Sequence, residues 1–493
     1  MCGIAGFVRP SCDGMPEDEM ENVVGRMADR LVHRGPDGRG HWVDSQAGVA
    51  LGHRRLSILD LSSAGQQPMV SASGRYVLVY NGEIYNFRAL RSRLEGLGHR
   101  FRGGSDTEVM LAGIDQWGLE SSLLQYSGMF AFALWDRASA VLTLARDRMG
   151  EKPLYYAHLP NGGLAFGSEL KALVAHPDFQ GRLDRQALAL FLRLSYIPAP
   201  HSIYEQAHKV EPATFLQFDC RQSPRLLRRE TYWSAYSSVT RTTRPYTDEE
   251  AEEGLLELLR ESTRSRLESD VPLGAFLSGG IDSSLIVALA QEQRGAPIKT
   301  FCMGFGDEGV NEAPYARAVA AHLESDHHEH TLNAHDALAL IPRLPHLYDE
   351  PFADSSQIAT HMLCLQARQQ VTVSLSGDGG DELFCGYTRY FRMFERWASI
   401  LKVPAPVRLS LIELRKKTAL WQALERLWGS FRRCLPWSLQ ARFPRYRTWK
   451  SLESVCYADL QSNYRAMTAT YARTCELLIY PEEPPTLFDQ KST

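Results

Sequence analysis

The sequence predicts two domains of different class, an α+β domain followed by an α/β domain with a parallel sheet. Residues 1 to about 205 are rich in short strand-like runs with helical patterns between them, which is typical of a layered α+β domain. After Thr247, strands, glycine-rich loops and helices alternate, and this alternation favours a parallel sheet flanked by helices. After about residue 390 the pattern is mostly helical.

The clearest local signal in the first domain is a pair of strand-like runs at 130–135 and 141–145. The turn-like residues 136–139 separate them, so they predict a β-hairpin. We also expect a strand at 76–80 and helices at 17–31 and 106–117.

Prolines mark the boundary between the domains. Residues 206–245 are expected to form a connector with strand elements, because Pro212, Pro224 and Pro245 interrupt them. The second domain is expected over 246–480, and the proline-rich, charged tail at 481–493 is predicted to be disordered. The elements expected in the second domain are a helix at 248–267 and strands at 274–277, 300–305 and 371–375.

Composition limits the class of protein. The 493 residues carry a net charge of −4, which does not suggest a nucleic-acid partner. The basic stretch 389–450 is interpreted as helices with solvated faces rather than as a surface for an anionic partner. Nine scattered cysteines favour a reducing compartment, and neither a signal peptide nor a membrane span is found, so a cytoplasmic protein is expected.

Cys2 is the first candidate for catalysis. If Met1 is removed, one residue carries both a thiol and a free α-amino group, which supplies a nucleophile and its base together. Taken alone, a cysteine near a terminus is as often incidental. A thiolate that attacks an amide forms an oxyanion, and Asn81 and Gly82 directly follow a predicted strand where their N–H groups would be its donors. By itself, Asn-Gly would more often be a turn.

Charged residues nearby suit an amino-acid substrate. Arg55 is able to bind an α-carboxylate through two hydrogen bonds, and Asp106, with help from Glu83, to bind an α-ammonium. Taken singly, Arg55 and Asp106 would more often be a surface ion-pair residue or a helix cap. The segment 33–37 is interpreted as a loop that forms part of the pocket wall.

Two glycine-rich loops carry the chemistry expected of the second domain. In the first, Ser278 to Ser284, backbone N–H groups converge at the start of an apolar helix that is expected from Leu285, which favours an anion. Asp282 would repel a phosphate unless a cation lies between them, so it implies Mg²⁺. The loop lacks the ending of a Walker loop and fits an ATP pyrophosphatase, which cleaves between the α- and β-phosphates. In the second, Ser376 to Glu382, the acids would hold a second Mg²⁺ contact or orient an amine nucleophile.

With these motifs in this order, the chain resembles glutamine-hydrolysing asparagine synthetases from residue 1 to about 390. The resemblance implies a four-layer αββα N-terminal-nucleophile glutaminase domain, joined to an ATP-pyrophosphatase domain with a helical C-terminal part. It also implies glutamine, ATP and aspartate as substrates, with ammonia delivered through an internal tunnel, and a homodimer.

The resemblance also implies a role for each residue that matches the family's motifs. In the first domain, Cys2 is the nucleophile, Asn81 and Gly82 form the oxyanion hole, and Arg55, Glu83 and Asp106 bind glutamine. In the second domain, the implied ATP-binding residues are Leu277, Ser278, Gly279, Gly280, Asp282, Ser283, Met303, Ser376 and Gly377. Asp282 and Asp381 are implied as Mg²⁺ ligands, and Asp378 stands where well-studied members carry a catalytic Glu.

No family motif is found after residue 390, so we expect the glutaminase half to work better than the synthetase half. Two alternatives stay open. The chain is an amidotransferase that amidates another carboxylate in a biosynthetic pathway, or it is a truncated subunit with a binding or regulatory role.

Overall fold

The computed structural model describes residues 1–10, 14–239, 245–306 and 311–416, together with residues 427, 484 and 486. Met1–Phe191 and Ser195–Gly377 belong to one compact unit, and the described residues of Asp378–Pro481 belong to a second, together with Leu192–Leu194. No helix in the described part of the chain is long and apolar enough to cross a membrane.

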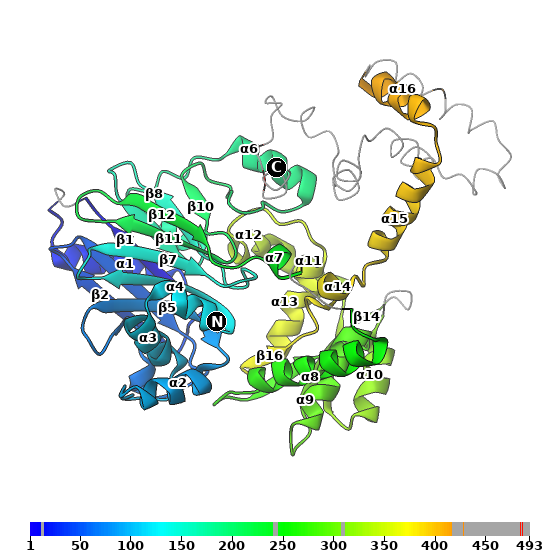
Figure 1. Cartoon of the computed structure of the whole chain (residues 1–493), viewed down its shortest axis with the longest axis horizontal. Coiled ribbons are helices and arrows are strands. Elements are labelled where there is room, and N and C mark those ends of the chain that lie inside the picture. The colour runs from blue at the N-terminus through cyan, green and yellow to red at the C-terminus, as the bar shows by residue number, and fades with distance from the viewer. Residues whose placement is uncertain are drawn as a thin grey trace. The chain divides into compact units, whose positions relative to one another are not determined.

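The first unit begins with two antiparallel sheets of six strands each (Figure 1). The order in one sheet is β10-β8-β9-β1-β3-β2, and in the other it is β12-β11-β7-β6-β5-β4. The first sheet consists of β1 (Gly3–Val8), β2 (Gly38–Asp44), β3 (Val49–Arg55), β8 (Tyr155–His158), β9 (Leu164–Gly167) and β10 (Ala207–Lys209). The second consists of β4 (Met69–Val70), β5 (Tyr76–Ile84), β6 (Gly128–Asp136), β7 (Val141–Arg146), β11 (Thr214–Asp219) and β12 (Arg225–Thr231).

The pairing of these strands bears on two expectations. The hairpin is confirmed, because β6 and β7 pair antiparallel from Asp136 opposite Val141. The residues expected to form a connector supply β10, β11 and β12, which extend both sheets at their edges. Most of the connector is therefore built into the first domain.

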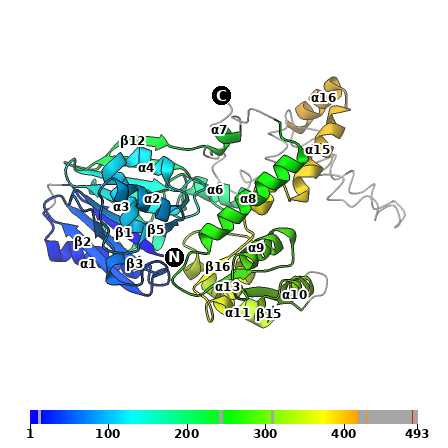
Figure 2. The ribbon, with the colours of Figure 1, turned by 60° about the horizontal axis from the view of Figure 1, so that its bottom comes forward.

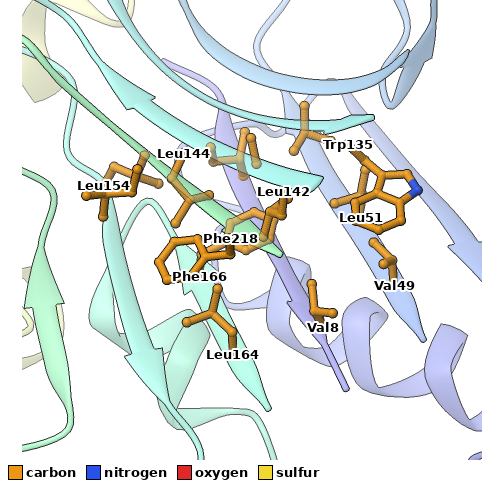
Figure 3. Packing of buried hydrophobic residues seen from close by; sticks show 14 of the residues in the cluster. Val8, Val49, Leu51, Trp135, Leu142, Leu144, Leu154, Leu164, Phe166 and Phe218 are labelled. Atoms are coloured by element: carbon orange, nitrogen blue, oxygen red, sulfur yellow. The ribbon is translucent and has the colours of Figure 1, made fainter. Parts of the chain in front are cut away.

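Residues of alternating orientation fill the space between the two sheets (Figure 3). Val49 and Leu51 of β3 lie in this inner core, whereas Ala50 packs in a separate cluster on the outer face. Successive side chains of a strand point to opposite faces of the sheet, so a strand that is covered on both faces contributes alternate residues to two different cores. Trp135, Phe166 and Phe218 are the largest side chains of the inner core, and all are fully buried.

Helices cover both outer faces and complete the four-layer αββα arrangement (Figure 2). The apolar sides of α1 (Glu17–Asp29), α5 (Leu170–Val174) and α6 (Arg185–Leu194) pack in the cluster on the sheet that contains β1. The helices α2 (Phe87–Gly96), α3 (Asp106–Trp117) and α4 (Leu119–Gln125) pack on the sheet that contains β5, and a short turn, η1 (Ser63–Gly65), precedes β4. The helices expected at 17–31 and 106–117 are thus present, and the first of them ends two residues early.

The first compact unit also contains the beginning of the expected second domain. This part is built on a parallel four-stranded sheet in the order β15-β14-β13-β16. Its strands are β13 (Leu273–Phe276), β14 (Lys299–Phe305), β15 (Asp326–Leu332) and β16 (Val373–Leu375). The helices are α7 (Ala235–Val239), α8 (Asp248–Arg266), α9 (Ile281–Glu292), α10 (Ala313–His322), α11 (Ala334–Leu340), η2 (Ile341–Arg343), α12 (Leu344–Leu347) and α13 (Ser356–Ala367). Buried residues of α9 and α10 pack against β13, and Ala367 of α13 packs against Phe301.

The parallel α/β class is therefore confirmed, with one difference that matters for the site. The helix after the first glycine-rich loop begins at Ile281 rather than at Leu285. Asp282 and Ser283 consequently lie in its first turn, where backbone N–H groups have no partner within the helix.

The second unit is helical where it is described. It contains α14 (Gly380–Phe384), α15 (Thr388–Leu401) and α16 (Ala405–Lys416), which agrees with the helical pattern expected after residue 390. Most of the basic stretch after residue 416 and nearly all of the tail at 481–493 lie outside the described residues.

Truncation of a central side chain tests this core. We expect Phe166→Ala to lower the free energy of unfolding of the first domain by about 3–5 kcal/mol, because the substitution leaves a cavity in the core between the two sheets. Urea denaturation followed by tryptophan fluorescence measures this, since Trp135 lies in the same core. Leu226 is exposed, so Leu226→Ala should change the free energy of unfolding by less than about 0.5 kcal/mol. Equal effects of the two substitutions would contradict the placement of Phe166 in the inner core.

Candidate active site

Cys2 lies immediately before β1, a central strand that pairs with β3 on one side and β9 on the other. Its Sγ is held at the end of β3, 3.4 Å from the Leu56 backbone nitrogen and 3.6 Å from the Leu56 carbonyl oxygen. Burial raises the pKa of the Cys2 thiol, so this thiol needs a nearby base to act as a nucleophile at neutral pH.

Asn81 and Gly82 lie within β5 and not in a turn, which overturns the simpler interpretation of this dipeptide. The Asn81 side chain is only 1% exposed, and neither its amide nitrogen nor its amide oxygen has a hydrogen-bond partner among the described residues. A buried carboxamide without partners is costly, and such groups often await a ligand. A Cβ on Gly82 would lie 2.2 Å from the Met129 carbonyl oxygen, so only glycine fits here.

A pocket brings these residues together with the predicted amino-acid ligands. Arg55 ends β3, and its guanidinium donates to the carbonyl oxygens of Ser62 at 2.8 Å and of Asp60. The loop therefore fixes the orientation of the guanidinium. The pocket is lined by Met1, Cys2, Arg55, Leu56, Ile58, Leu59, Gly65, Gln67, Tyr80, Asn81, Gly82, Glu83, Ser105, Asp106, Thr107, Met129 and Lys152.

Two acids share the far side of the pocket. Asp106 is the first residue of α3 and is buried, whereas Ser105 acts as the N-cap, so Asp106 is not the helix cap. Its carboxylate accepts hydrogen bonds from Tyr80 Oη at 2.8 Å and from the Ile84 backbone nitrogen at 2.9 Å. Burial raises the pKa of Asp106, and burial followed by the charge of Asp106 raises the pKa of Glu83 to about 7. A bound ammonium group would favour the ionised form of both acids and so lower their pKa values.

Lys152 is a pocket residue that the motifs did not indicate. Its backbone nitrogen donates to Asp147 Oδ2 at 2.9 Å, and its Nζ lies 2.8 Å from Met129 Sδ. Asp147 is fully buried and also accepts from the Glu151 backbone nitrogen, so it fixes the turn that carries Lys152. Burial lowers the pKa of Lys152. In the sequence this segment looks like an ordinary polar turn after β7.

The segment 33–37 lies behind the nucleophile and is not part of the pocket lining. Arg34 Nε donates to the Cys2 carbonyl oxygen at 2.9 Å, and Arg34 Nη1 contacts Glu169 Oε1 at 2.7 Å. The Ser57 backbone nitrogen donates to Asp37 at 2.9 Å. Glu169 is a second residue that the motifs did not indicate, and only the folded chain brings it to Arg34.

The second centre is the loop between β13 and α9. Ser278 Oγ and Ser283 Oγ lie 2.9 Å apart, and the Gly280 backbone nitrogen donates to Ser278 Oγ at 3.2 Å. Gly279 has a φ of +80°, and a Cβ there would lie 2.5 Å from the Ala316 backbone nitrogen. Gly280 is the N-cap of α9 and has no side chain that could cap the helix. The N–H groups at the start of a helix favour an anion.

The end of β16 meets this loop. A Cβ on Gly377 would lie 2.7 Å from the Ser283 backbone nitrogen, so Ser376 and Gly377 lie against the start of α9 and leave room only for a glycine. Met303, on β14, is nearly buried. The Leu277 side chain packs in the hydrophobic core and its backbone nitrogen donates to the Phe301 carbonyl oxygen at 2.9 Å, so only its own carbonyl oxygen is available to a nucleotide.

The acids of the second glycine-rich loop belong to the second compact unit. Asp381 lies in α14, and its carbonyl oxygen accepts from the Gly386 backbone nitrogen at 3.0 Å. The pairing of Asp282 with Asp381 around Mg²⁺, and the role of Asp378, stay predictions. Within the described residues no cluster of three or more His, Cys, Asp or Glu is arranged to hold a metal ion. Mg²⁺ that is held by one or two carboxylates and by substrate phosphates does not require such a cluster, so Asp282 fits that role.

Comparison with known proteins divides the chain between residues 233 and 254, where the antiparallel sheets end and the part with the parallel sheet begins. Residues 1–233 match the model of a glutamine amidotransferase domain, and residues 254–474 match the asparagine synthase model. The first match includes the strands expected to form the connector. The second extends beyond residue 390, where the recognised motifs end.

Three relatives illustrate the similarity. Asparagine synthetase (glutamine-hydrolyzing) 1 of Bacillus subtilis is 36% identical over 82% of this chain and 62% of its own length. A putative asparagine synthetase (glutamine-hydrolyzing) 2 of Methanocaldococcus jannaschii is 34% identical over 83% of this chain and 80% of its own length. A protein of Gibberella zeae named Amidase chry2 is 32% identical over 79% of this chain and 60% of its own length. On these matches, the chain belongs to the family of glutamine-hydrolysing asparagine synthetases.

Proposed function

We propose that this protein is a glutamine-dependent amidotransferase of the asparagine synthetase type, which acts in the cytoplasm. It hydrolyses glutamine at Cys2 and transfers the ammonia to the β-carboxylate of aspartate after ATP has activated that carboxylate as an adenylate. The observation that carries the proposal is the Cys2 thiol in one pocket with the buried, unpartnered amide of Asn81. That pair is the minimum for acyl transfer.

In the first half-reaction, Arg55 binds the α-carboxylate of glutamine, and Asp106 and Glu83 bind its α-ammonium. Cys2 Sγ attacks the side-chain amide carbon, and Asn81 Nδ2 with the Gly82 N–H stabilises the oxyanion that forms. The C–N bond then breaks, ammonia leaves, and a thioester remains on Cys2. Water hydrolyses this thioester to release glutamate and the free thiol.

The base in this scheme is the α-amino group of Cys2 after Met1 has been removed. Burial lowers the pKa of the Met1 amino group to about 6, and the same enclosure would act on an amine at residue 2. An amine on residue 2 whose pKa is lowered in the same direction would be neutral at pH 7 and able to accept the thiol proton. The same amine then returns the proton to the amide nitrogen, which leaves as ammonia.

In the second half-reaction, the loop from Ser278 to Ser283 and the start of α9 bind the pyrophosphate part of ATP. Ser376, Gly377, Met303 and the backbone of Leu277 contact the rest of the nucleotide. Mg²⁺, held by Asp282 and Asp381, would neutralise charge on the phosphates. Asp378 orients the ammonia as it attacks the adenylate.

The acceptor defines a second candidate function, amidation of a different carboxylate. The similarity to a relative named Amidase chry2, whose name does not refer to asparagine, favours this candidate. A screen of pyrophosphate release from ATP, with glutamine and one carboxylate at a time, separates the two. Release that requires aspartate supports the first proposal, and release with another carboxylate but not with aspartate supports the second. No pyrophosphate release with any carboxylate would reject both.

Loss of the oxyanion donor should affect rate more than binding. We expect Asn81→Ala to lower kcat for glutamate release by about 100- to 1,000-fold with little change in KM, because the amide acts only when the oxyanion forms. A glutamate assay measures both constants. The matched control is the exposed Asn161→Ala, which should behave as the parent protein. A large rise in KM at an unchanged kcat would instead make Asn81 a substrate ligand.

Glutamine affinity should depend on the charge of Glu83. Because the pKa of Glu83 is about 7, this carboxylate is ionised above that pH and protonated below it. We expect the Kd of glutamine for Cys2→Ala to rise as the pH falls below about 7, measured by calorimetry between pH 5.5 and 8. Cys2→Ala/Glu83→Gln should bind weakly, with a much flatter pH dependence. An unchanged pH profile in the double variant would exclude Glu83 as a ligand of the ammonium.

The two half-reactions should separate at Asp282. We expect Asp282→Asn to abolish ATP-dependent pyrophosphate release while glutamate release stays within about twofold, since the carboxylate serves only the phosphates. Asp248→Asn removes a first-turn acid from another helix, α8, and is the matched control. Normal pyrophosphate release by Asp282→Asn would remove this residue from the nucleotide site.

A further inference from the structure

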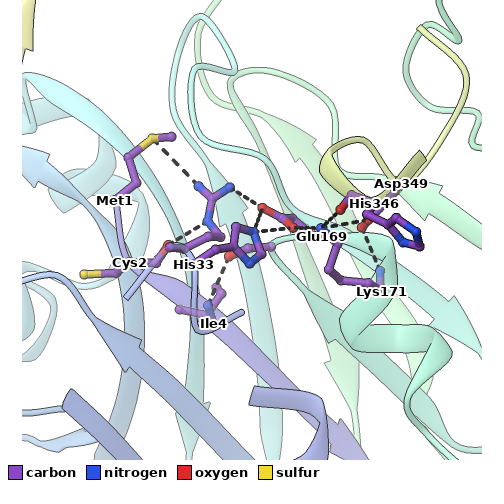
Figure 4. A network of polar contacts seen from close by, with 10 residues as sticks. Met1, Cys2, Ile4, His33, Glu169, Lys171, His346 and Asp349 are labelled. Atoms are coloured by element: carbon purple, nitrogen blue, oxygen red, sulfur yellow. Dashed lines mark hydrogen bonds and ion pairs between the residues drawn. The ribbon is translucent and has the colours of Figure 1, made fainter. Parts of the chain in front are cut away.

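A continuous line of charged contacts leads from the backbone of Cys2 into the domain that matches the asparagine synthase model (Figure 4). Arg34 donates to the Cys2 carbonyl oxygen at 2.9 Å and to Glu169 Oε1 at 2.7 Å. Lys171 Nζ lies 2.9 Å from Glu169 Oε2 and 3.2 Å from Asp349 Oδ1. Four side chains thus connect residue 2 with residue 349.

The four side chains are largely buried, so the electrostatic interactions between them are stronger than those of ion pairs at the surface. Arg34 is 8% exposed, Glu169 16%, Lys171 22% and Asp349 12%. Burial opposes the ionisation of Glu169, but the hydrogen bond from His33 and the charge of Arg34 outweigh it and lower its pKa to about 2. Glu169 is therefore ionised throughout the neutral pH range.

Glu169 and Lys171 are also tied to both ends of the line through the backbone. The Ser168 backbone nitrogen donates to the Ile4 carbonyl oxygen at 2.9 Å, and the Ile4 nitrogen donates to Ser168 Oγ at 3.0 Å. At the other end, the Lys171 backbone nitrogen donates to Asp349 Oδ2 at 2.7 Å. Asp349 is therefore connected to the first residues of β1 both through side chains and through the backbone.

We propose that Glu169, Lys171 and Asp349 are positioning residues for the nucleophile, so that a residue of the synthetase domain controls the reactivity of Cys2. They act through Arg34, which holds the Cys2 carbonyl. The inference rests on the proposed function only in taking Cys2 as the nucleophile. Small displacements of a nucleophile are costly, since about 1 Å of misplacement costs a reaction about 100-fold.

A neighbouring ion pair supplies a matched control. Glu350, next to Asp349, pairs with Lys209 and accepts from the Ile203 backbone nitrogen at 3.3 Å. Lys209 in turn donates to the Ile197 carbonyl oxygen. This second pair joins the same two domains, but its contacts lead to Ile197 and Ile203 and not to Arg34.

The experiment compares Asp349→Asn and Lys171→Met with Glu350→Gln and Lys209→Met in the full chain. The readouts are kcat and KM for glutamate release from glutamine without ATP, the rate of Cys2 alkylation by iodoacetamide, and Tm. Asp349→Asn removes the charge but keeps an oxygen for the Lys171 N–H, so the fold should persist.

We expect Asp349→Asn and Lys171→Met to lower kcat and the alkylation rate by about fivefold or more, with KM within about twofold. KM should hold because Arg55 and Asp106 do not belong to the line. Glu350→Gln and Lys209→Met should leave both rates within about twofold at a comparable Tm.

Two results would overturn the inference. Parent-like rates in Asp349→Asn and Lys171→Met would show that these residues do not influence Cys2. An equal loss of rate in all four variants, in proportion to the loss of Tm, would show that both sets of contacts only hold the two domains together. A parent protein that releases no glutamate would refute the proposed function instead, and the alkylation rates would then decide the inference alone.

Discussion

The site in the first domain depends on the face-to-face packing of two sheets. Cys2 comes from the sheet of β1, and Asn81 comes from β5 in the other sheet, so neither sheet alone forms the pocket. The hydrophobic core between them sets their separation, and His53 adds a buried hydrogen bond of 3.1 Å from its Nε2 to the Tyr80 carbonyl oxygen. Burial lowers the pKa of His53 to about 4, so its imidazole is uncharged at neutral pH and the hydrogen bond is kept.

Polar groups in the pocket are held in place before any substrate arrives. Loop carbonyl oxygens orient Arg55, while Tyr80 and the Ile84 N–H orient Asp106. Such fixed groups need not reorganise when a ligand binds, and this reduces the entropic cost of binding. The Asn81 amide is the exception, since it is buried and none of the described residues is its hydrogen-bond partner. A buried polar group in that state destabilises the protein until a ligand satisfies it.

The sequence predicted most of the fold because periodicity and turn residues are local signals. The hairpin of β6 and β7, helix α3 and the parallel class of the second domain followed directly from such patterns. The predicted residues Cys2, Arg55, Asn81, Glu83 and Asp106 line one pocket. Lys152 and Glu169 were missed, because charged residues without a motif are expected at the surface, and 135 residues separate Glu169 from its partner Arg34 along the chain. The segment that contains Arg34 was expected in the pocket wall, but it does not line the pocket. The start of α9 was placed four residues late, because Ile281 is the only apolar residue of its first turn before Leu285.

The central claim is that Cys2 is the mature N-terminal residue and the nucleophile of this pocket. Intact-protein and peptide mass spectrometry after incubation with the L-form of a glutamine analogue that bears a diazoketone tests it most directly. The account predicts loss of Met1 and one adduct, located on Cys2, which the D-form does not produce. A protein that retains Met1, or that carries the adduct on a different cysteine, would contradict the account.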